Sequence, residues 1–311
     1  MKSKVRISKI IWSIICVIAL SAVASISANK ISVADYKEMS DSDRLMFDAL
    51  SQVYNVFEQN PKEIWTENFL LHKRPIVLYD KNGLLRGSTY VVNIDLSKSL
   101  HAKKVAMPND FYGGDVYRVT GIHPSLFALW RQSKVVTIGE ICAVALIYNK
   151  STINDGSFIN NLVYDGYLLY AREKSKITLP LEYESEVIAY NDLISRILES
   201  ETEKEKNTTI SDLISAREEQ SKNNLFADRY ITINEMYHGA ALYCVVNIAR
   251  ALESEYTVSI DNPLAQSGEA LGRILDNLPI GSGWRCAVEN SEEESLVTQY
   301  SLLREYCRQN M

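Results

Sequence analysis

The chain has 311 residues, of which 46% are hydrophobic and 23% charged, a composition typical of a globular protein with a substantial core. Its formal net charge of −6 argues against a nucleic-acid partner and against anionic membrane surfaces, because both carry negative charge.

The first 28 residues are predicted to be a secretory signal peptide. Basic residues between positions 2 and 9 precede an apolar run over 10–24, and the small residue Ala28 stands before Asn29. The length and flanks of the run fit export better than a spanning helix, although an uncleaved anchor is the alternative. We therefore expect a secreted or periplasmic bacterial protein with no membrane span after cleavage.

Residues 29–150 are predicted to form a helix followed by a strand-rich part. The segment 41–60 has helical periodicity, and Asp41 or Ser42 could cap its start. Its apolar face would carry Leu45, Leu50, Val53 and Phe57. Residues 61–150 are rich in Val, Ile, Tyr and Thr and contain turn signals such as "DKNG" and "YGGD". This pattern predicts four or five strands, mostly antiparallel.

Residues 151–311 are predicted to be helical and to pack with the strands as one compact α+β unit. Predicted helices cover 157–175, 182–200, 209–223, 225–254, 264–278 and 293–308. Thr209 and Asp212 resemble a capping box, and 201–207 is either a linker or the solvated end of a helix. "GSGW" (281–284) is predicted to be a turn. Gly268 and Gly272 share a helix face, which predicts close backbone packing.

Four cysteines follow the predicted signal peptide: Cys142, Cys244, Cys286 and Cys307. They allow three pairings, and a bridge between Cys286 and Cys307 is favoured because both lie near the C-terminus. Buried free thiols are the alternative.

One stretch of a predicted helix, "LVYDGYLLYAREK" (162–174), has the spacing of a zinc-hydrolase motif without its ligands. In H-E-x-x-H, two histidines one turn apart bind the metal, and the Glu activates the bound water. Here Tyr164 and Leu168 stand at the histidine positions and Asp165 at the position of the base.

The order of motifs from 157 to about 290 resembles a zincin-like bacterial family related to gluzincin metallopeptidases. That family has an H-E-G-F-H helix, a Glu-rich helix, a helix with E-G-x-A-x-Y, and a small-residue helix ending in "LLD" before a Trp. This chain reads "YDGYL", "YESEVIAYNDLI", "HGAALY" and "SGEALGRILDNLPIGSGW". The matching positions are Gly166, Tyr167, Gly239, Ala241, Tyr243, Gly268, Asp276 and Trp284.

The departures from the family pattern lie at the positions of the metal ligands and the general base. The resemblance implies that Tyr164, Leu168 and His238 stand at the three ligand positions, so the H-E-x-x-H motif is degenerate. We expect no cofactor, with zinc as the alternative, held by Tyr164, Asp165 and His238 and aided by Glu186 or Glu182. In a purely structural interpretation, Tyr164 and Tyr167 pack in the core and Leu168 fills the space that the metal would occupy. His238 would then be hydrogen-bonded to Asp165 or Tyr164.

Two functions follow as hypotheses. The first is a secreted pseudoenzyme that serves as a binding module for a peptide, a protein or a small molecule. Its candidate binding residues are Tyr164, Tyr167, Glu186 and Tyr243. The second is an active hydrolase in which Asp165 and His238 perform acid–base chemistry, with or without metal.

Overall fold

The structure is a computed structural model. It describes residues 35–80, 89–119, 134–175, 190–253, 258, 260–292 and 295–310, together with positions 12, 13, 16, 17 and 20. The chain divides into two compact units. Unit 1 contains Met1–Glu58 and His72–Phe158, and unit 2 contains Gln59–Leu71 and Ile159–Met311. The predicted signal peptide, the "DKNG" turn and Glu186 lie largely or wholly outside the described residues.

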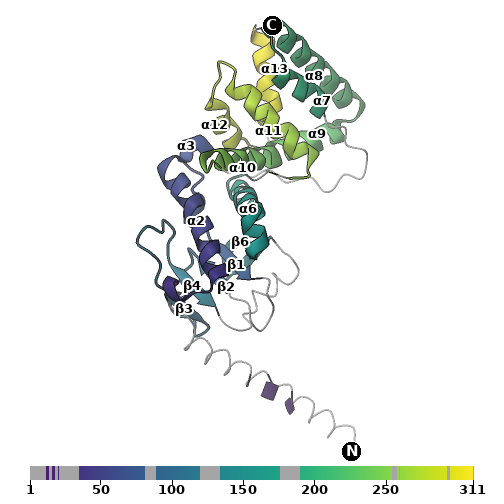
Figure 1. Cartoon of the computed structure of the whole chain (residues 1–311). Coiled ribbons are helices and arrows are strands. Elements are labelled where there is room, and N and C mark those ends of the chain that lie inside the picture. The colour runs from purple at the N-terminus through teal and green to yellow at the C-terminus, as the bar shows by residue number, and fades with distance from the viewer. Residues whose placement is uncertain are drawn as a thin grey trace, which may run out of the picture. The chain divides into compact units, whose positions relative to one another are not determined.

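Unit 1 is built on a six-stranded sheet with the order β3-β4-β2-β1-β6-β5 (Figure 1). The strands are β1 (Ile76–Asp80), β2 (Thr89–Val92), β3 (Ala102–Val105), β4 (Val116–Val119), β5 (Val135–Ile138) and β6 (Ile141–Tyr148). Pairing is antiparallel throughout except between β1 and β6, which run parallel. The α+β class is thus confirmed, and the sheet has one strand more than the upper predicted count.

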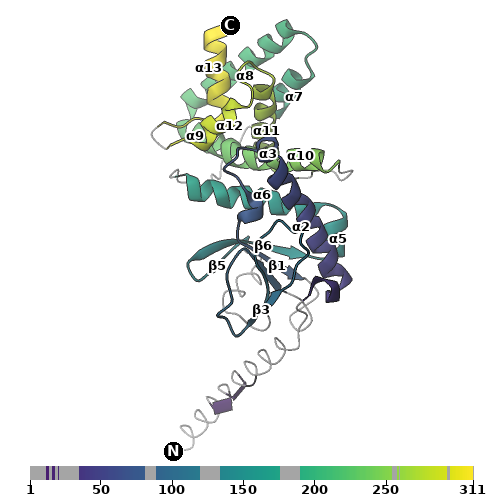
Figure 2. The same ribbon diagram turned by 90° about the vertical axis from the view of Figure 1, so that its left-hand side faces the viewer.

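Helix α2 (Asp41–Gln59) packs against the sheet, as its position beside the strands in Figure 2 shows. Phe47 meets the Tyr90 ring of β2 edge-on at 5.0 Å, and the Tyr90 hydroxyl donates to the buried Asp43 carboxylate over 3.0 Å. The cap is Ser40, whose hydroxyl accepts from the Asp43 N–H, instead of the predicted Asp41 or Ser42. Leu45 is only half-buried, so the apolar face is rotated slightly from the predicted one.

Short helical segments complete unit 1. They are η1 (Tyr36–Glu38), η2 (Leu71–Lys73) and α5 (Lys150–Asn154). Asn149 caps α5 directly after β6 in a capping box with Thr152, so the chain turns from strand to helix within one residue.

Unit 2 is helical. Its elements are α3 (Pro61–Ile64), α6 (Ser157–Lys174, the first two residues belonging to unit 1), α7 (Asn191–Glu199), α8 (Glu203–Asn223), α9 (Leu225–Asn234), the π-helix η4 (Glu235–Gly239), α10 (Ala240–Ala251), α11 (Pro263–Asp276), α12 (Gly283–Glu289) and α13 (Gln299–Asn310). Helices α7 and α8 lie side by side as a hairpin (Figures 1 and 2). None of the described helices combines the length and the apolar character needed to cross a membrane.

A segment from the N-terminal half completes the core of unit 2. Trp65 is 1% exposed, and its ring meets those of Tyr167, Tyr243 and Trp284 edge-on, with centroids 5.1 to 6.0 Å apart. The Arg285 guanidinium donates to the carbonyl oxygens of Lys62 and Trp65 over 2.6 and 3.0 Å. Residues 59–71 therefore belong to the helical unit, which differs from the predicted division at 150.

Several predicted boundaries in unit 2 need correction. Helix α8 begins at Glu203 with Thr202 as its cap, so 201–207 opens this helix and the capping box predicted at Thr209 is wrong. The predicted helix over 225–254 is interrupted by a π-helix turn, and "GSGW" leads into α12. The last helix starts at Gln299, six residues later than predicted.

The predicted disulfide is also wrong. Cys286 is exposed and Cys307 buried, and both are free thiols, as are Cys142 and Cys244. The alternative of buried thiols holds for Cys244 and Cys307, and burial raises the pKa of the Cys244 thiol well above its ordinary value. A raised thiol pKa means little thiolate at neutral pH, so Cys244 is an unreactive core residue.

Candidate functional site

The helix that carries "YDGYL", α6, buries most of this segment in unit 2. Tyr164, Asp165 and Tyr167 are 6%, 5% and 3% exposed, and Leu168 is half-buried. Gly166 faces Leu71, and an added Cβ would overlap the Leu71 side chain. The glycine in "YDGYL" is therefore explained by close packing against the 59–71 segment.

The π-helix η4 places His238 opposite α6. Its wide turn is held from one side by α11, where a Cβ on Gly268 would clash with the Glu235 carbonyl oxygen and one on Gly239 with the Gly268 backbone. These two glycines thus allow the backbones to touch, as predicted for Gly268. A π turn shifts the register of all following side chains and often occurs at functional sites.

The Tyr164 hydroxyl and His238 Nδ1 lie 2.7 Å apart, and the two rings are stacked with centroids separated by 5.9 Å. At this distance the phenol and the imidazole form a hydrogen bond, and this bond joins α6 to η4. His238 is half-buried, so the pair sits at the margin of the core. The structural interpretation, in which His238 is hydrogen-bonded to Tyr164, agrees with this geometry.

The environment of Tyr164 keeps its phenol protonated. Burial raises the pKa of this hydroxyl above its ordinary value, a side-chain hydrogen bond with Asn262 lowers it, and the nearby Asp165 charge raises it. Asn262 also caps α11 by accepting from the Leu264 and Ala265 N–H groups. A protonated phenol is a poor metal ligand, because the proton must leave before the oxygen binds a cation.

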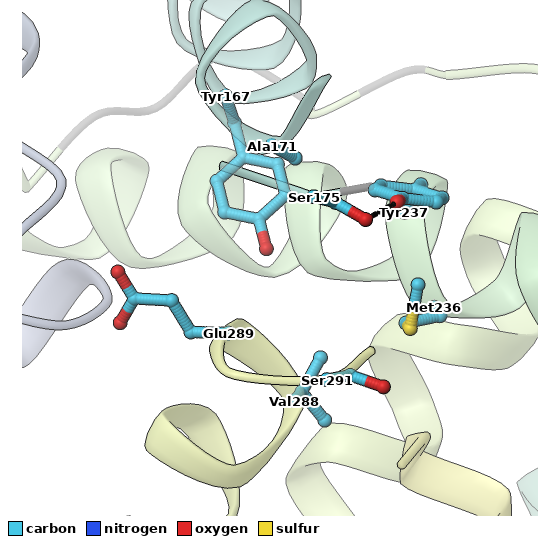
Figure 3. A pocket seen from close by; sticks show the side chains of 8 residues that line it. All are labelled: Tyr167, Ala171, Ser175, Met236, Tyr237, Val288, Glu289 and Ser291. Carbon is cyan, nitrogen blue, oxygen red and sulfur yellow. Dashed lines mark hydrogen bonds between the residues drawn. The ribbon is translucent and has the colours of Figure 1, made fainter. Parts of the chain in front are cut away.

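Unit 2 also contains a small pocket (Figure 3). Its walls are Tyr167, Ala171, Ser175, Met236, Tyr237, Val288, Glu289 and Ser291. Figure 3 shows the Tyr167 hydroxyl pointing into the space and the Tyr237 hydroxyl bonded to Ser175, over 2.5 Å. The cavity volume of about 20 Å³ suits a water molecule and is far below that of a drug-sized ligand site.

The last predicted binding residue, Tyr243, is a core residue here. It is 4% exposed, its hydroxyl donates to Asp276 over 2.6 Å, and its ring meets Trp284 edge-on. Trp284 Nε1 donates to the other Asp276 oxygen over 2.9 Å. Burial followed by the hydrogen bond to Asp276 raises the pKa of Tyr243 to about 12. The matched positions Tyr243, Asp276 and Trp284 thus converge on one scaffold network.

The structure places both members of the predicted acid–base pair in unit 2. His238 Nδ1 contacts the Tyr164 hydroxyl, and Asp165, the next residue along α6 after Tyr164, is buried. Among the described residues, no three His, Cys, Asp or Glu side chains gather as a group that could hold a metal ion. Glu186, the fourth predicted donor, is outside the described part of the chain.

Sequence reasoning missed the most buried polar contact of this region. Arg217 of α8 is 1% exposed and donates to both Glu235 oxygens over 2.9 and 2.7 Å. Ser267 donates to the same carboxylate over 2.5 Å, and the Arg217 guanidinium lies 4.3 Å from the centre of the Tyr300 ring. Arg217 sits in a strongly polar helix, so its sequence context resembles that of a solvated residue.

Comparison with family models, with curated proteins and with solved structures finds no match. The site is therefore interpreted from its own geometry.

Proposed function

We propose that this chain is a zincin-like pseudoenzyme that works as a binding module. One observation carries the proposal. The positions that the resemblance aligns with two metal ligands, Tyr164 on α6 and His238 on the π-helix, face each other at 2.7 Å. The two are 74 residues apart in the sequence, so their meeting was not required by local structure.

The scaffold positions support the same interpretation. Gly239 packs on Gly268, Gly272 faces Trp284 and Tyr243, and Asp276 accepts from both of those aromatic side chains. These contacts join the helices on which the resemblance rests. In a working zincin, the space between Tyr164 and His238 would hold a metal, whereas here a hydrogen bond spans it.

The geometry favours a peptide or protein partner over a small molecule. The pocket lined by Tyr167 and Tyr237 accommodates little more than water. His238 and Leu168 are only half-buried, so they remain accessible at the margin of the core. A partner would use this margin as a surface, with His238 as a polar contact and Leu168 as an apolar one.

The first test is the zinc content of the chain purified without chelator or affinity metal. We expect far less than one zinc per chain and no rise in melting temperature when zinc is added, because a buried protonated phenol and one imidazole bind zinc weakly. About one zinc per chain that disappears in His238→Ala would overturn the pseudoenzyme and would favour the hydrolase alternative.

The second test restores the presumed ligands. The quadruple variant Tyr164→His, Asp165→Glu, Leu168→His, His238→Glu should bind zinc if the backbone is zincin-like. The matched control carries His238→Ala in place of His238→Glu and should bind much more weakly, because it lacks a third ligand. A folded quadruple variant, checked by circular dichroism, that binds no more zinc than this control would count against the zincin-like scaffold.

A further inference from the structure

The chain passes between the two units three times, and two residues that touch each other border the first two crossings in unit 1. Glu58 is the last residue before the excursion of 59–71, and His72 is the first residue after it. Their side chains meet, with His72 Nε2 at 2.9 Å from Glu58 Oε2. The two ends of the excursion are therefore in contact within unit 1.

The two partners differ in their access to water. The His72 side chain is 2% exposed, whereas that of Glu58 is 47% exposed. The Tyr54 ring of α2 packs against the imidazole with centroids 6.4 Å apart, and the Asn93 amide fixes the nearby backbone by donating to the His72 and Arg74 carbonyl oxygens. The imidazole is thus enclosed at the junction, next to a carboxylate that reaches solvent.

The contact is electrostatic, not a well-aligned hydrogen bond. Neither ring nitrogen of His72 has a partner in good hydrogen-bonding geometry among the described residues, although the carboxylate is close. A neutral imidazole tolerates such an environment, but a buried imidazolium would lose its hydration without gaining aligned acceptors.

We propose that His72 is a pH-sensitive latch at this junction, closed while the imidazole is neutral and buried, and open when it is protonated and moves to solvent beside Glu58. We call Glu58 and His72 the junction latch. When it opens in acid, the chain segments at these two crossings would become less firmly held.

The charged groups around the imidazole determine the direction of the effect. Burial lowers the pKa of His72 below its ordinary value, the Glu58 carboxylate on α2 raises it, and the Lys73 ammonium on the same short helix lowers it. Because the folded-state pKa lies below the unfolded one, the latch contributes stability above pH about 6.5. This contribution falls as the pH drops through that value toward the lower folded-state pKa.

Hydrogen exchange of the whole chain tests the latch. Protection factors for peptides covering 54–62 and 69–77 are measured between pH 7.5 and 5.0 and corrected for intrinsic exchange rates. We expect protection to fall toward acid by up to about ten-fold per pH unit, the limit for one proton. His72→Gln should remove this pH dependence, and the control His101→Gln, in the same unit, should keep it.

Glu58→Gln tests independently the direction in which the pH dependence of protection should shift. Removing the carboxylate lowers the His72 pKa further, so the loss of protection should move to lower pH. Protection that does not change with pH, an unchanged acid response in His72→Gln, or a shift to higher pH in Glu58→Gln would each overturn the latch. If His72→Gln does not fold, the direction of the Glu58→Gln shift decides.

Discussion

The π-helix η4 carries two polar side chains, Glu235 and His238, that differ in burial and in hydrogen bonding. At its first residue, Glu235 is 2% exposed and bound by Arg217 and Ser267. Three residues later, His238 is half-buried and shares one hydrogen bond with Tyr164. The first side is a buried ion pair with a serine hydroxyl, and the second is a tyrosine–histidine hydrogen bond at the margin of the core.

This difference separates scaffold from site. Charges removed from water must be paired completely, because an unpaired buried charge is strongly destabilising. The Glu235 side therefore tolerates little change and holds the π turn in place. The Tyr164–His238 side consists of one hydrogen bond to a half-buried imidazole, so we expect it to cost less to alter.

The largest effect is expected on the charged side. Glu235→Gln leaves the Arg217 guanidinium in a buried site with Asp228 as its remaining carboxylate, 3.7 Å away. We expect a loss of about 3–5 kcal/mol in the free energy of unfolding, measured by urea denaturation. The matched control is Glu218→Gln, which removes a carboxylate that pairs with Arg308 at the surface and should change stability by less than about 1 kcal/mol.

A double variant sharpens this result. Arg217→Leu with Glu235→Leu removes both charges, so it should be clearly more stable than either single variant. A double variant whose loss of stability equals the sum of the two single losses would show that the two charges do not interact, and the contrast between the two sides would be lost.

The next effect concerns the backbone contact that allows the π turn. In Gly268→Ala the new methyl group meets the Glu235 carbonyl oxygen, which belongs to backbone and cannot swing away. We expect a loss of about 1–3 kcal/mol, seen as a lower melting temperature. Gly283→Ala is the control, because a Cβ at Gly283 meets open space. Equal melting temperatures for the two variants would contradict the close packing.

A smaller loss in the free energy of unfolding is expected at the Tyr164–His238 pair. Tyr164→Phe removes one hydroxyl from a hydrogen bond with His238 and should cost about 1 kcal/mol. A double-mutant cycle with His238→Ala should give a coupling energy of about 0.5–1.5 kcal/mol. A coupling near zero would mean that the two side chains do not stabilise each other.

The smallest effect is expected for His238→Gln. The amide can still accept a proton from Tyr164, and the side chain is only half-buried, so stability should stay within about 0.5 kcal/mol of the parent. Isothermal denaturation measures this value. A loss as large as that of Glu235→Gln would show that both sides of the π-helix are scaffold.

Local patterns predicted those parts of the fold that depend on neighbouring residues. The helix over 41–60 and the motif helix over 157–175 match α2 and α6 within one residue at each end, because their apolar residues recur with helical period. The close packing at Gly268 was also predictable, since a helix rarely keeps a glycine without a contact that excludes a side chain.

The sequence by itself therefore determined the α+β class and the main helices. Only the tertiary structure decided that Tyr164 meets His238 and that Arg217 is buried against Glu235. It also decided that Trp65, far away in the sequence, completes the helical core. Periodicity reports which face of an element is apolar, but the partner of a polar side chain depends on contacts between distant segments, which no local pattern encodes.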